Sequence, residues 1–345
     1  MTRIALFQTK GWEAEYETEK LKEAGIDVDC YEEGIDKASI KDPLSYEGVS
    51  VFVGPLVNKE SLGKFSNLKL VTTRSTGFDH IDLAYAQEKN FALGYVPHYG
   101  ENTVAEFAMG LILTVSRKLY LGVDRIKEDE GFSFDGLEGF DLKGKTLGVV
   151  GTGRIGAHVI KMAKGFDMHI VAHDAYPNEA LAKEHGFSYI PLEELLATSD
   201  VITIHVPYLP TTHHLINKQN IEKIKKGAIL INTARGAVVE TEALVIALQK
   251  GILGGAGLDV LEEEGVLKDE QGFWLRDADD DAPGVNLRTV LQDNILIDMP
   301  NVVVTPHNAF NTKEAKTRIL DADIENITAF FKGGAAQNPI PTKKN

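Results

Sequence analysis

Short apolar runs and amphipathic segments alternate along most of the chain. Residues 3–7, 49–54 and 68–73 are apolar runs of strand length. Between the first two of them, residues 15–25 have the spacing of a helix. This alternation is typical of a parallel sheet with helices on its faces. The first part of the chain therefore predicts an α/β domain that ends near the Pro- and Gly-containing turn at 95–102.

A second alternation begins after residue 144 and contains a glycine-rich turn. Its six predicted strands are residues 145–151, 168–174, 201–206, 228–234, 255–260 and 301–307. Helical patterns separate them, for example at 241–251, and a last helical stretch covers 312–334. Six strands with a glycine-rich turn after the first are typical of a complete dinucleotide-binding fold.

A long apolar segment at 102–122 lies between the two alternations. Its spacing predicts one helix, with Asn102 or Thr103 as the N-cap and Glu106 in the first turn. Its length approaches that of a membrane span, but it contains glutamate, arginine and lysine. We therefore expect a buried helix between domains or in a dimer.

Composition narrows the classes of partner. A chain of 345 residues is long enough for two domains, and its net charge of -15 disfavours nucleic acid and anionic membranes as partners. The single cysteine, Cys30, excludes an intrachain disulfide and fits a cytoplasmic protein. Because Cys30 ends an alternating segment, we expect it to be a small core residue. The first ten residues predict a strand and lack a signal-peptide core.

The glycine-rich turn carries the first functional signal. Gly151, Gly153 and Gly156 match G-x-G-x-x-G between a predicted strand and an amphipathic helix. The pattern permits a tight turn, a close approach to a pyrophosphate, and close packing of helix on strand. The next predicted strand ends at Asp174, which can bind an adenosine ribose and would repel a 2′-phosphate. These residues predict NAD as the cofactor in preference to NADP.

Candidate chemistry gathers where later strands end. Arg235, Asp259 and His307 follow three predicted strands, and Glu264 comes five residues after Asp259. Ligands of open parallel sheets bind at this edge. Histidine can donate a proton to a substrate carbonyl, a carboxylate can orient it, and arginine can hold a substrate carboxylate. Two structural alternatives remain open: a surface ion pair for Arg235 and a buried structural role for His307.

Five short motifs together resemble one enzyme family. They are GTGRIG at 151–156, HVP at 205–207, NTARG at 232–236, GLDV at 257–260 and TPH at 305–307. Their order resembles that of the D-isomer-specific 2-hydroxyacid dehydrogenases, most of all the D-lactate dehydrogenase branch. The resemblance implies that Arg235 binds substrate, that His307 is the acid/base, and that Glu264 is its partner. Glu262 and Glu263 are rivals for that last role. The resemblance favours Glu264, because the D-lactate dehydrogenase branch uses the carboxylate 29 residues after the arginine, and Glu264 lies 29 residues after Arg235.

The resemblance also implies a domain organisation. We expect two Rossmann-like domains: a six-stranded parallel NAD-binding domain at 101–308, inserted into a flavodoxin-like substrate domain made of 1–100 and 309–345. Substrate contacts are then expected from Thr76, Gly77, Tyr99 and Phe310, with Phe52 as a further pocket residue, although Tyr99 could be plain core. The expected cofactor contacts are Gly151, Gly153, Arg154, Ile155, Gly156, Asp174, Val206, Pro207, Thr212, Thr233, Ala234 and Asp259. Asp259 could instead only cap a strand end.

The expected activity is NAD-dependent reduction of a small 2-keto acid, pyruvate first, to the D-2-hydroxy acid by a homodimer. Phenylpyruvate, 2-ketoisocaproate, hydroxypyruvate, glyoxylate and phosphite are alternative substrates, and a NAD(H)-sensing, partner-binding protein is an alternative class. No metal is expected, and the adjacent His213 and His214 are expected to be solvated. Residues 265–300 predict an extended loop with a short helical piece.

Overall fold

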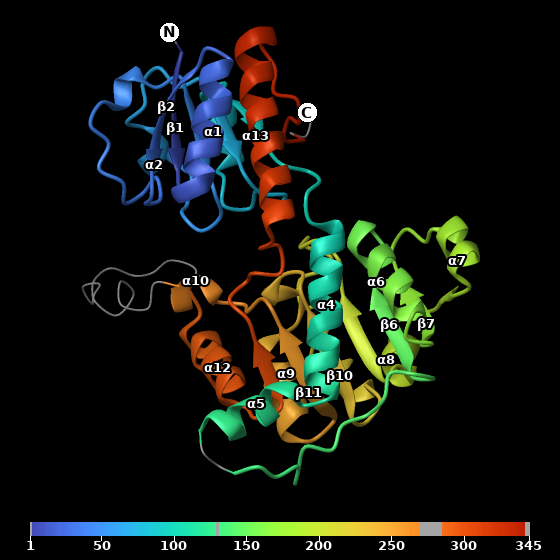
Figure 1. Cartoon of the computed structure of the whole chain (residues 1–345). Coiled ribbons are helices and arrows are strands. Elements are labelled where there is room, and N and C mark those ends of the chain that lie inside the picture. Colours follow the sequence, from blue (N-terminus) through green and yellow to red (C-terminus); the bar gives the residue numbers. More distant parts are fainter. Residues whose placement is uncertain (1, 129–130, 269–284, 342–345) are drawn as a thin grey trace. The chain divides into compact units, whose positions relative to one another are not determined.

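The computed structural model describes residues 2–128, 131–268 and 285–341. The chain forms two compact units (Figure 1). We call Met1–Tyr99 with Thr312–Asn345 the terminal unit, and Gly100–Asn311 the central unit. Both ends of the chain thus belong to one unit, and the central unit is a single continuous stretch.

The terminal unit is built on a five-stranded parallel sheet in the order β2-β1-β3-β4-β5. The strands are β1 (Arg3–Phe7), β2 (Asp27–Tyr31), β3 (Gly48–Val51), β4 (Leu70–Thr73) and β5 (Ala92–Gly94). The helices are α1 (Gly11–Glu23), α2 (Lys59–Leu62), α3 (Leu83–Glu88) and α13 (Lys313–Gly333). This strand order is the flavodoxin-like one, as expected.

Two apolar layers hold this sheet. On one face, Leu21 of α1 and Ile327 of α13 pack with Ile4 and Leu6 of β1. Figure 1 shows α1 and α13 side by side on that face. The other face packs against α2 and α3 through a separate cluster that includes Leu62 and Tyr85. The last long helix of the chain is therefore part of the core of its first domain.

The central unit contains a seven-stranded parallel sheet in the order β12-β11-β10-β9-β6-β7-β8. Its strands are β6 (Thr146–Val150), β7 (His169–His173), β8 (Ser188–Tyr189), β9 (Val201–Ile204), β10 (Ala228–Asn232), β11 (Leu253–Leu258) and β12 (Val302–Val304). The six expected strands are present, but the expected count of six is wrong. The additional β8 has two residues and no apolar run, so only its pairing with β7, at the edge of the sheet, reveals it.

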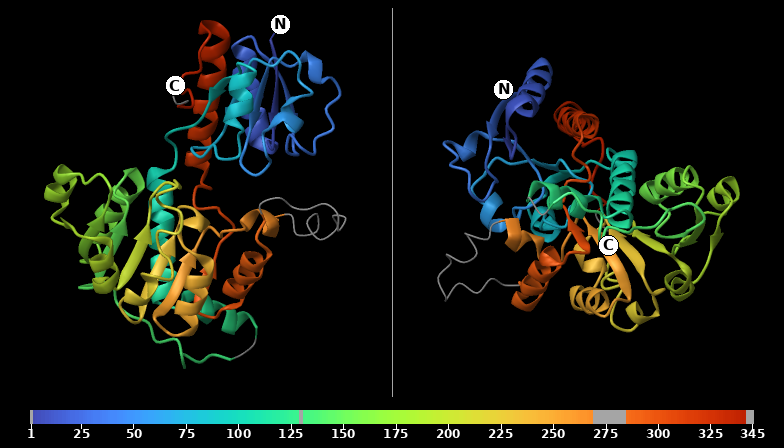
Figure 2. Two further views of the ribbon diagram at one scale, coloured as in Figure 1. Left: turned by 180° about the vertical axis from the view of Figure 1, so that it is seen from behind. Right: turned by 60° about the horizontal axis from the view of Figure 1, so that its bottom comes forward.

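Helices cover both faces of this sheet (Figure 2). They are α4 (Glu101–Ser116), α5 (Leu119–Lys127), α6 (Arg154–Lys164), α7 (Glu179–His185), α8 (Leu192–Thr198), α9 (Thr241–Gln249), α10 (Glu264–Lys268) and α12 (Leu287–Asp298). Helices α4 and α6 share one apolar cluster with β6, and α8, α9 and α12 share the other with β9 and β10. Because both faces are covered, the inner strands are almost wholly apolar.

The helix expected at 102–122 differs from the prediction in two respects, its continuity and its N-cap. It is two helices, α4 and α5, separated at Lys118, whose φ of 49° is left-handed. The N-cap is Gly100, without a side-chain cap. Its first half, α4, packs on the sheet of its own unit through residues such as Ile112. In the part of the chain that the structure describes, no helix is long and apolar enough to cross a membrane.

Two further expectations need correction. Cys30 is exposed rather than buried in the core, because it lies on the edge strand β2, where its Sγ is 3.5 Å from Thr18 Oγ1 of α1. The segment 265–300 contains more helix than expected. Residues up to 268 continue α10, and α12 begins after Asn286, whose side chain accepts from the backbone N–H groups of Arg288 and Thr289. Residues 269–284 lie outside the described part of the chain.

Candidate active site

The glycine-rich turn joins β6 to α6, and two of its glycines are sterically required. Gly151 has a φ of 93°, and a Cβ there would lie 2.8 Å from the backbone of His205. A Cβ on Gly156 would lie 2.1 Å from the carbonyl oxygen of Gly151. Neither position can take a side chain without moving backbone, so these glycines set the close packing of α6 on β6.

Gly153 differs from the other two because its Cβ position has no neighbour within 4 Å. Gly153 is the N-cap of α6 and has no side-chain cap. A helix N-terminus presents unpaired N–H groups and a partial positive charge. The exposed Gly153 and Arg154 and the half-buried Ile155 therefore border a cradle that fits the pyrophosphate of a dinucleotide.

Asp174 lies directly after β7 and closes this cradle on one side. Its Oδ2 accepts from Thr152 N at 2.6 Å and Thr152 Oγ1 at 3.0 Å, and its Oδ1 accepts from Tyr176 N at 2.9 Å. Partial burial raises the pKa of Asp174, but these hydrogen bonds outweigh burial and hold it below the usual value. Asp174 is thus a carboxylate at neutral pH, placed at the glycine turn.

The segment after β9 is a compact turn ordered by its own hydrogen bonds. Thr212 Oγ1 donates to Pro207 O and accepts from Leu209 N, both at 2.7 Å. Burial lowers the pKa of the His205 imidazole to about 3, so this ring is neutral near neutral pH. The expected cofactor residues Val206, Pro207 and Thr212 therefore share one ordered turn beside Gly151.

Arg235 follows β10 on a turn that is fixed by Asn232, a residue the sequence analysis did not single out. Asn232 is buried; its Oδ1 accepts from Ala234 N at 3.0 Å and its Nδ2 donates to Arg235 O at 2.9 Å. Thr233 and Ala234 are buried on the same turn. The signal available in the sequence is a polar residue that ends an apolar strand, a pattern typical of turn formation.

His307 lies beyond β12 and pairs with Glu264. His307 Nδ1 is 2.7 Å from Glu264 Oε1, and both side chains are about one-quarter exposed. The backbone of His307 has a φ of 52°, in the left-handed region that non-glycine residues rarely adopt. Such a conformation persists only where the surroundings fix it, and it is frequent at functional sites.

Hydrogen bonds to Asp259 help to hold the backbone of His307 in this conformation. Its carboxylate is buried and accepts from Thr305 Oγ1 at 2.6 Å, Asn308 N at 3.0 Å and Ala309 N at 2.9 Å. Burial holds the pKa of Asp259 above its usual value, although these hydrogen bonds and the nearby His307 partly oppose the rise. In this structure Asp259 therefore holds the backbone on both sides of His307.

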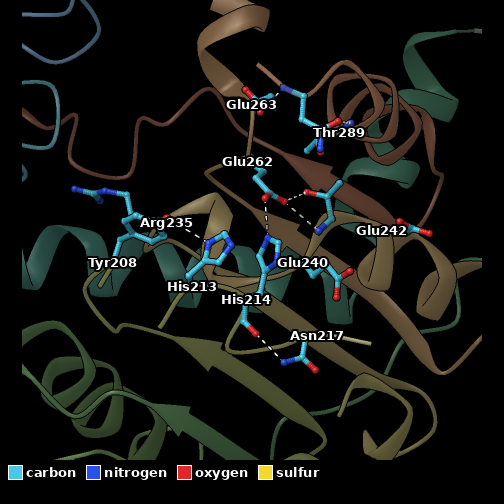
Figure 3. Close-up of polar contacts among 12 residues, drawn as sticks. Tyr208, His213, His214, Asn217, Arg235, Glu240, Glu242, Glu262, Glu263 and Thr289 are labelled. Atoms are coloured by element: carbon cyan, nitrogen blue, oxygen red, sulfur yellow. Dashed lines mark hydrogen bonds and ion pairs between the residues drawn. The ribbon is translucent and has the colours of Figure 1, made fainter. Parts of the chain in front are cut away.

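The three consecutive glutamates have three different partners. Glu264 is hydrogen-bonded to His307, Glu263 Oε1 accepts from Asn286 N, and Glu262 Oε1 is 2.7 Å from His214 Nε2. Figure 3 shows the last of these pairs. The expectation that His214 is merely solvated is therefore wrong, since a glutamate 48 residues away in sequence binds it. His213 is exposed and stacks on His214.

The candidate catalytic residues of the central unit lie at one edge of its sheet, because they follow neighbouring strands. β10, β11 and β12 are neighbours in the parallel sheet, so Arg235, Glu264 and His307 all follow its carboxyl edge. Phe310 is half-buried three residues beyond His307. Among the described residues, no group of three His, Cys, Asp or Glu side chains could hold a metal ion.

The remaining candidates belong to the terminal unit. Thr76 is exposed and its Oγ1 donates to Val96 O at 2.7 Å, while Gly77 O accepts from Ser75 Oγ at 2.6 Å. Tyr99 and Phe52 are half-buried, so Tyr99 is not plain core. These residues follow β3, β4 and β5, at the carboxyl edge of the terminal sheet.

Comparison with known proteins agrees with this architecture. Residues 109–309 match the family model of the D-isomer specific 2-hydroxyacid dehydrogenase NAD-binding domain. The chain is 32% identical to the D-lactate dehydrogenase of Escherichia coli over 343 residues, which covers 98% of this chain and 99% of that protein. It is 35% identical over 300 residues to an aromatic 2-oxoacid reductase of Clostridium sporogenes, 85% of each chain.

A solved structure is similar over almost the whole length. The D-lactate dehydrogenase of Aquifex aeolicus, crystallised with NAD and lactic acid, superposes with a TM-score of 0.83 and 35% sequence identity. The match covers 98% of this chain and 100% of that one.

The chain belongs to the D-isomer specific 2-hydroxyacid dehydrogenase family. Within that family it lies in the branch that resembles D-lactate dehydrogenase. It is an NAD-dependent oxidoreductase that acts on CH–OH groups. The open cradle at Gly153 and the carboxylate of Asp174 fit that cofactor.

Proposed function

We propose that the protein reduces a small 2-keto acid, with pyruvate as the first choice, to the D-2-hydroxy acid. The observation that carries this proposal is the 2.7 Å hydrogen bond between His307 and Glu264, at the sheet edge where Arg235 also lies. Similarity to D-lactate dehydrogenases supports both pyruvate and the D configuration.

In this proposal each residue has one task. His307 Nε2 donates a proton to the substrate carbonyl oxygen, because Nδ1 is occupied by Glu264. Glu264 orients the imidazole ring and stabilises its protonated form. The guanidinium of Arg235 holds the substrate carboxylate and polarises the carbonyl. NADH, when bound, supplies the hydride.

The cofactor and the rest of the substrate are assigned to other residues. The pyrophosphate lies over Gly153 at the N-terminus of α6, and Asp174 accepts hydrogen bonds from the adenosine ribose. Val206, Pro207, Thr212, Thr233 and Ala234 contribute further cofactor contacts. In the terminal unit, the N–H groups of Thr76 and Gly77 are assigned to the substrate carboxylate, and Tyr99 and Phe52 to its side chain. Phe310 of the central unit is also assigned to the substrate side chain.

A larger substrate is the second candidate. The relative from Clostridium sporogenes is an aromatic 2-oxoacid reductase. Phenylpyruvate therefore belongs in the same test as pyruvate, together with 2-ketoisocaproate, hydroxypyruvate and glyoxylate.

The test is NADH oxidation at 340 nm against these acids. We expect pyruvate to give the largest kcat/KM, and His307→Ala to lower it by about 10²- to 10⁴-fold, the usual contribution of a general acid. His169→Ala is the matched control, because His169 is exposed at the start of β7, at the opposite edge of the sheet. Full activity of His307→Ala would contradict the assigned proton donor.

Other outcomes would change the conclusion in defined ways. Preference for phenylpyruvate would keep the mechanism and change the substrate. Tight NADH binding without turnover of any acid would contradict the proposed reaction and favour a dinucleotide sensor.

We also propose that the protein is a homodimer formed through the central units. Helix α4 packs on the sheet of its own unit. Helix α5, in contrast, exposes Leu119, Val123 and Ile126 at helical spacing, and each side chain is about half accessible. Phe132 and Phe134 follow and are also exposed. A contiguous apolar stripe of this kind is typical of a protein interface.

A further inference from the structure

Glu262 binds two segments that are distant in sequence. Its Oε1 is 2.7 Å from His214 Nε2, in the turn after β9. Its Oε2 accepts from Thr241 Oγ1 at 2.8 Å and from Thr241 N at 3.3 Å, at the start of α9. Figure 3 shows the contact between Glu262 and His214. Both carboxylate oxygens are thus engaged by groups outside the segment that carries Glu262.

The two bound segments enclose the turn that carries Arg235. The turn after β9 pairs with the stretch after Arg235, because His214 N donates to Ala237 O at 2.8 Å and Ile216 N donates to Val238 O at 3.1 Å. Thr241 lies just beyond this stretch. Glu262 therefore holds the structure on both sides of residues 236–239.

Direct packing also joins the two segments. A Cβ on Gly236 would lie 2.1 Å from the carbonyl carbon of Leu261 and 2.3 Å from Glu262 N. The backbone next to Arg235 therefore touches the backbone next to Glu262, and Glu264 follows two residues later. A shift of one segment must displace the other, since interiors at this density do not deform freely.

The neighbouring glutamate does not share this connection. Glu263 N donates to Asp293 Oδ2 at 3.0 Å, and Glu263 Oε1 accepts from Asn286 N at 3.0 Å. Both of these partners lie at α12. Glu263 thus attaches the same segment to a different helix, which makes it a control for the effect of Glu262.

We propose that Glu262 is a positioning residue that, through His214 and Thr241, holds the Arg235 turn and the Glu264 segment in one fixed relative arrangement. The inference deepens the proposed function and depends on it for the roles of Arg235 and Glu264. Glu262 itself touches no substrate. Its effect is on where the substrate anchor and the partner of His307 lie relative to each other.

Loss of Glu262 should change keto-acid turnover but not cofactor binding. The glycine turn and Asp174 belong to β6, α6 and β7, whereas the partners of Glu262 described above lie after β9 and at the start of α9. Loss of Glu262 should therefore leave the dissociation constant of NADH close to that of the wild type. A displacement of about 1 Å at the reacting groups can cost about 100-fold in rate, so kcat/KM for the keto acid should fall steeply.

The experiment compares Glu262→Ala, Glu262→Gln, His214→Ala and the double variant Glu262→Ala/His214→Ala, with Glu263→Gln as control. We expect kcat/KM for pyruvate to fall by about 100-fold in Glu262→Ala, with NADH affinity retained. Glu262→Gln should recover part of the loss, because the amide oxygen can still accept a hydrogen bond from Thr241 and the rest of the amide can still bond to His214. The double variant should be little worse than Glu262→Ala, since both changes remove one connection. Glu263→Gln should resemble the wild type.

A second measurement does not require turnover. Amide hydrogen exchange of Glu262→Ala with NADH bound should accelerate at 235–239 and at 262–264 together. Faster exchange only at the start of α9 would show that Glu262 is a helix cap and would overturn the proposal. Equal losses in the Glu262 and Glu263 variants would overturn it as well.

Failure of this inference can be told apart from failure of the proposed function. If the wild type reduces no 2-keto acid, the proposed function fails, and the exchange experiment still decides whether Glu262 couples the two segments. If the wild type is active and Glu262→Ala keeps its kcat/KM, the inference alone fails.

Discussion

A single carboxylate, Asp174, organises the glycine turn and is the residue that we propose for binding the ribose of the cofactor. Its Oδ2 accepts two hydrogen bonds from Thr152, which lies between Gly151 and Gly153. Its charge is the feature expected to exclude a 2′-phosphate. Removing the side chain and removing only its charge should therefore have different effects.

We expect Asp174→Asn to raise kcat/KM with NADPH relative to NADH by about tenfold, because hydrogen bonds to charged groups contribute about 1.5–3 kcal/mol. The asparagine oxygen can still accept from Thr152, so the turn should persist. Asp174→Ala should also relax the preference but lower the melting temperature. The measurement is the ratio of the two kcat/KM values beside thermal unfolding. An unchanged ratio in both variants would show that Asp174 does not select the cofactor.

At the scale of residues, the sequence predicted those side chains whose residue type and motif directly indicate a chemical role. Arg235 and His307 stand in recognisable motifs at strand ends. Asn232, Glu262 and His214 were missed as positioning groups, because their importance lies in contacts that only the fold creates. The Glu262–His214 pair spans 48 residues, and no local pattern encodes such a distance.

At the scale of elements, five segments of the terminal unit meet in a buried polar cluster. Arg74, just after β4, lies 3.6 Å from Glu17 of α1, measured between Nη1 and Oε1, and also donates to Phe7 O. Ser50 of β3 donates to Asp323 of α13 at 2.6 Å. Arg74 Nη1 is also 3.4 Å from Ser50 Oγ, so one guanidinium lies near both buried carboxylates, directly before the Thr76–Gly77 loop.

This cluster predicts a pH dependence of stability. Burial raises the pKa of Glu17 to about 7 from 4.5, against the opposing charge of Arg74. Because the folded-state pKa is the higher one, the contribution of Glu17 is fully present below pH 4.5 and is lost as pH rises through about 7. The free energy of unfolding should fall over this window by roughly 3 kcal/mol.

Glu17→Gln should flatten this part of the profile, because glutamine cannot ionise. Urea denaturation at several pH values, followed by Trp12 of α1 in a Trp274→Phe background, measures it. An identical slope in Glu17→Gln and its parent would assign the pH dependence to other groups.

Element prediction succeeded where the hydrophobic period was long and failed where it was short or uniform. The six longer strands of the central sheet follow from apolar runs, whereas the two-residue β8 has none. The segment 102–122 is apolar throughout, so its pattern gave no sign of the left-handed Lys118 that separates α4 from α5. Asn286 is a good N-cap for α12, but the polar sequence before it led us to expect a loop.

At the scale of the whole molecule, the exposed stripe on α5 predicts self-association. We expect the wild type to elute as a dimer and Leu119→Lys/Val123→Lys to elute as a monomer, because two charges in an apolar interface are costly to bury. Lys127→Ala is a control on the same helix that leaves the stripe intact. Size-exclusion chromatography with light scattering measures the mass. A dimer of unchanged affinity in the double variant would place the interface elsewhere.

The division of the chain has a consequence for its synthesis. The terminal unit needs α13, since Ser50 bonds to Asp323 and Ile4 packs with Ile327. Residues 1–99 emerge from the ribosome long before these partners are translated, whereas the central unit is continuous and complete by residue 311. The domain that begins first must therefore finish folding last, and during translation its sheet lacks one of the two helices that cover one face. A nascent chain halted before α13 would be the form of this protein that most needs a chaperone.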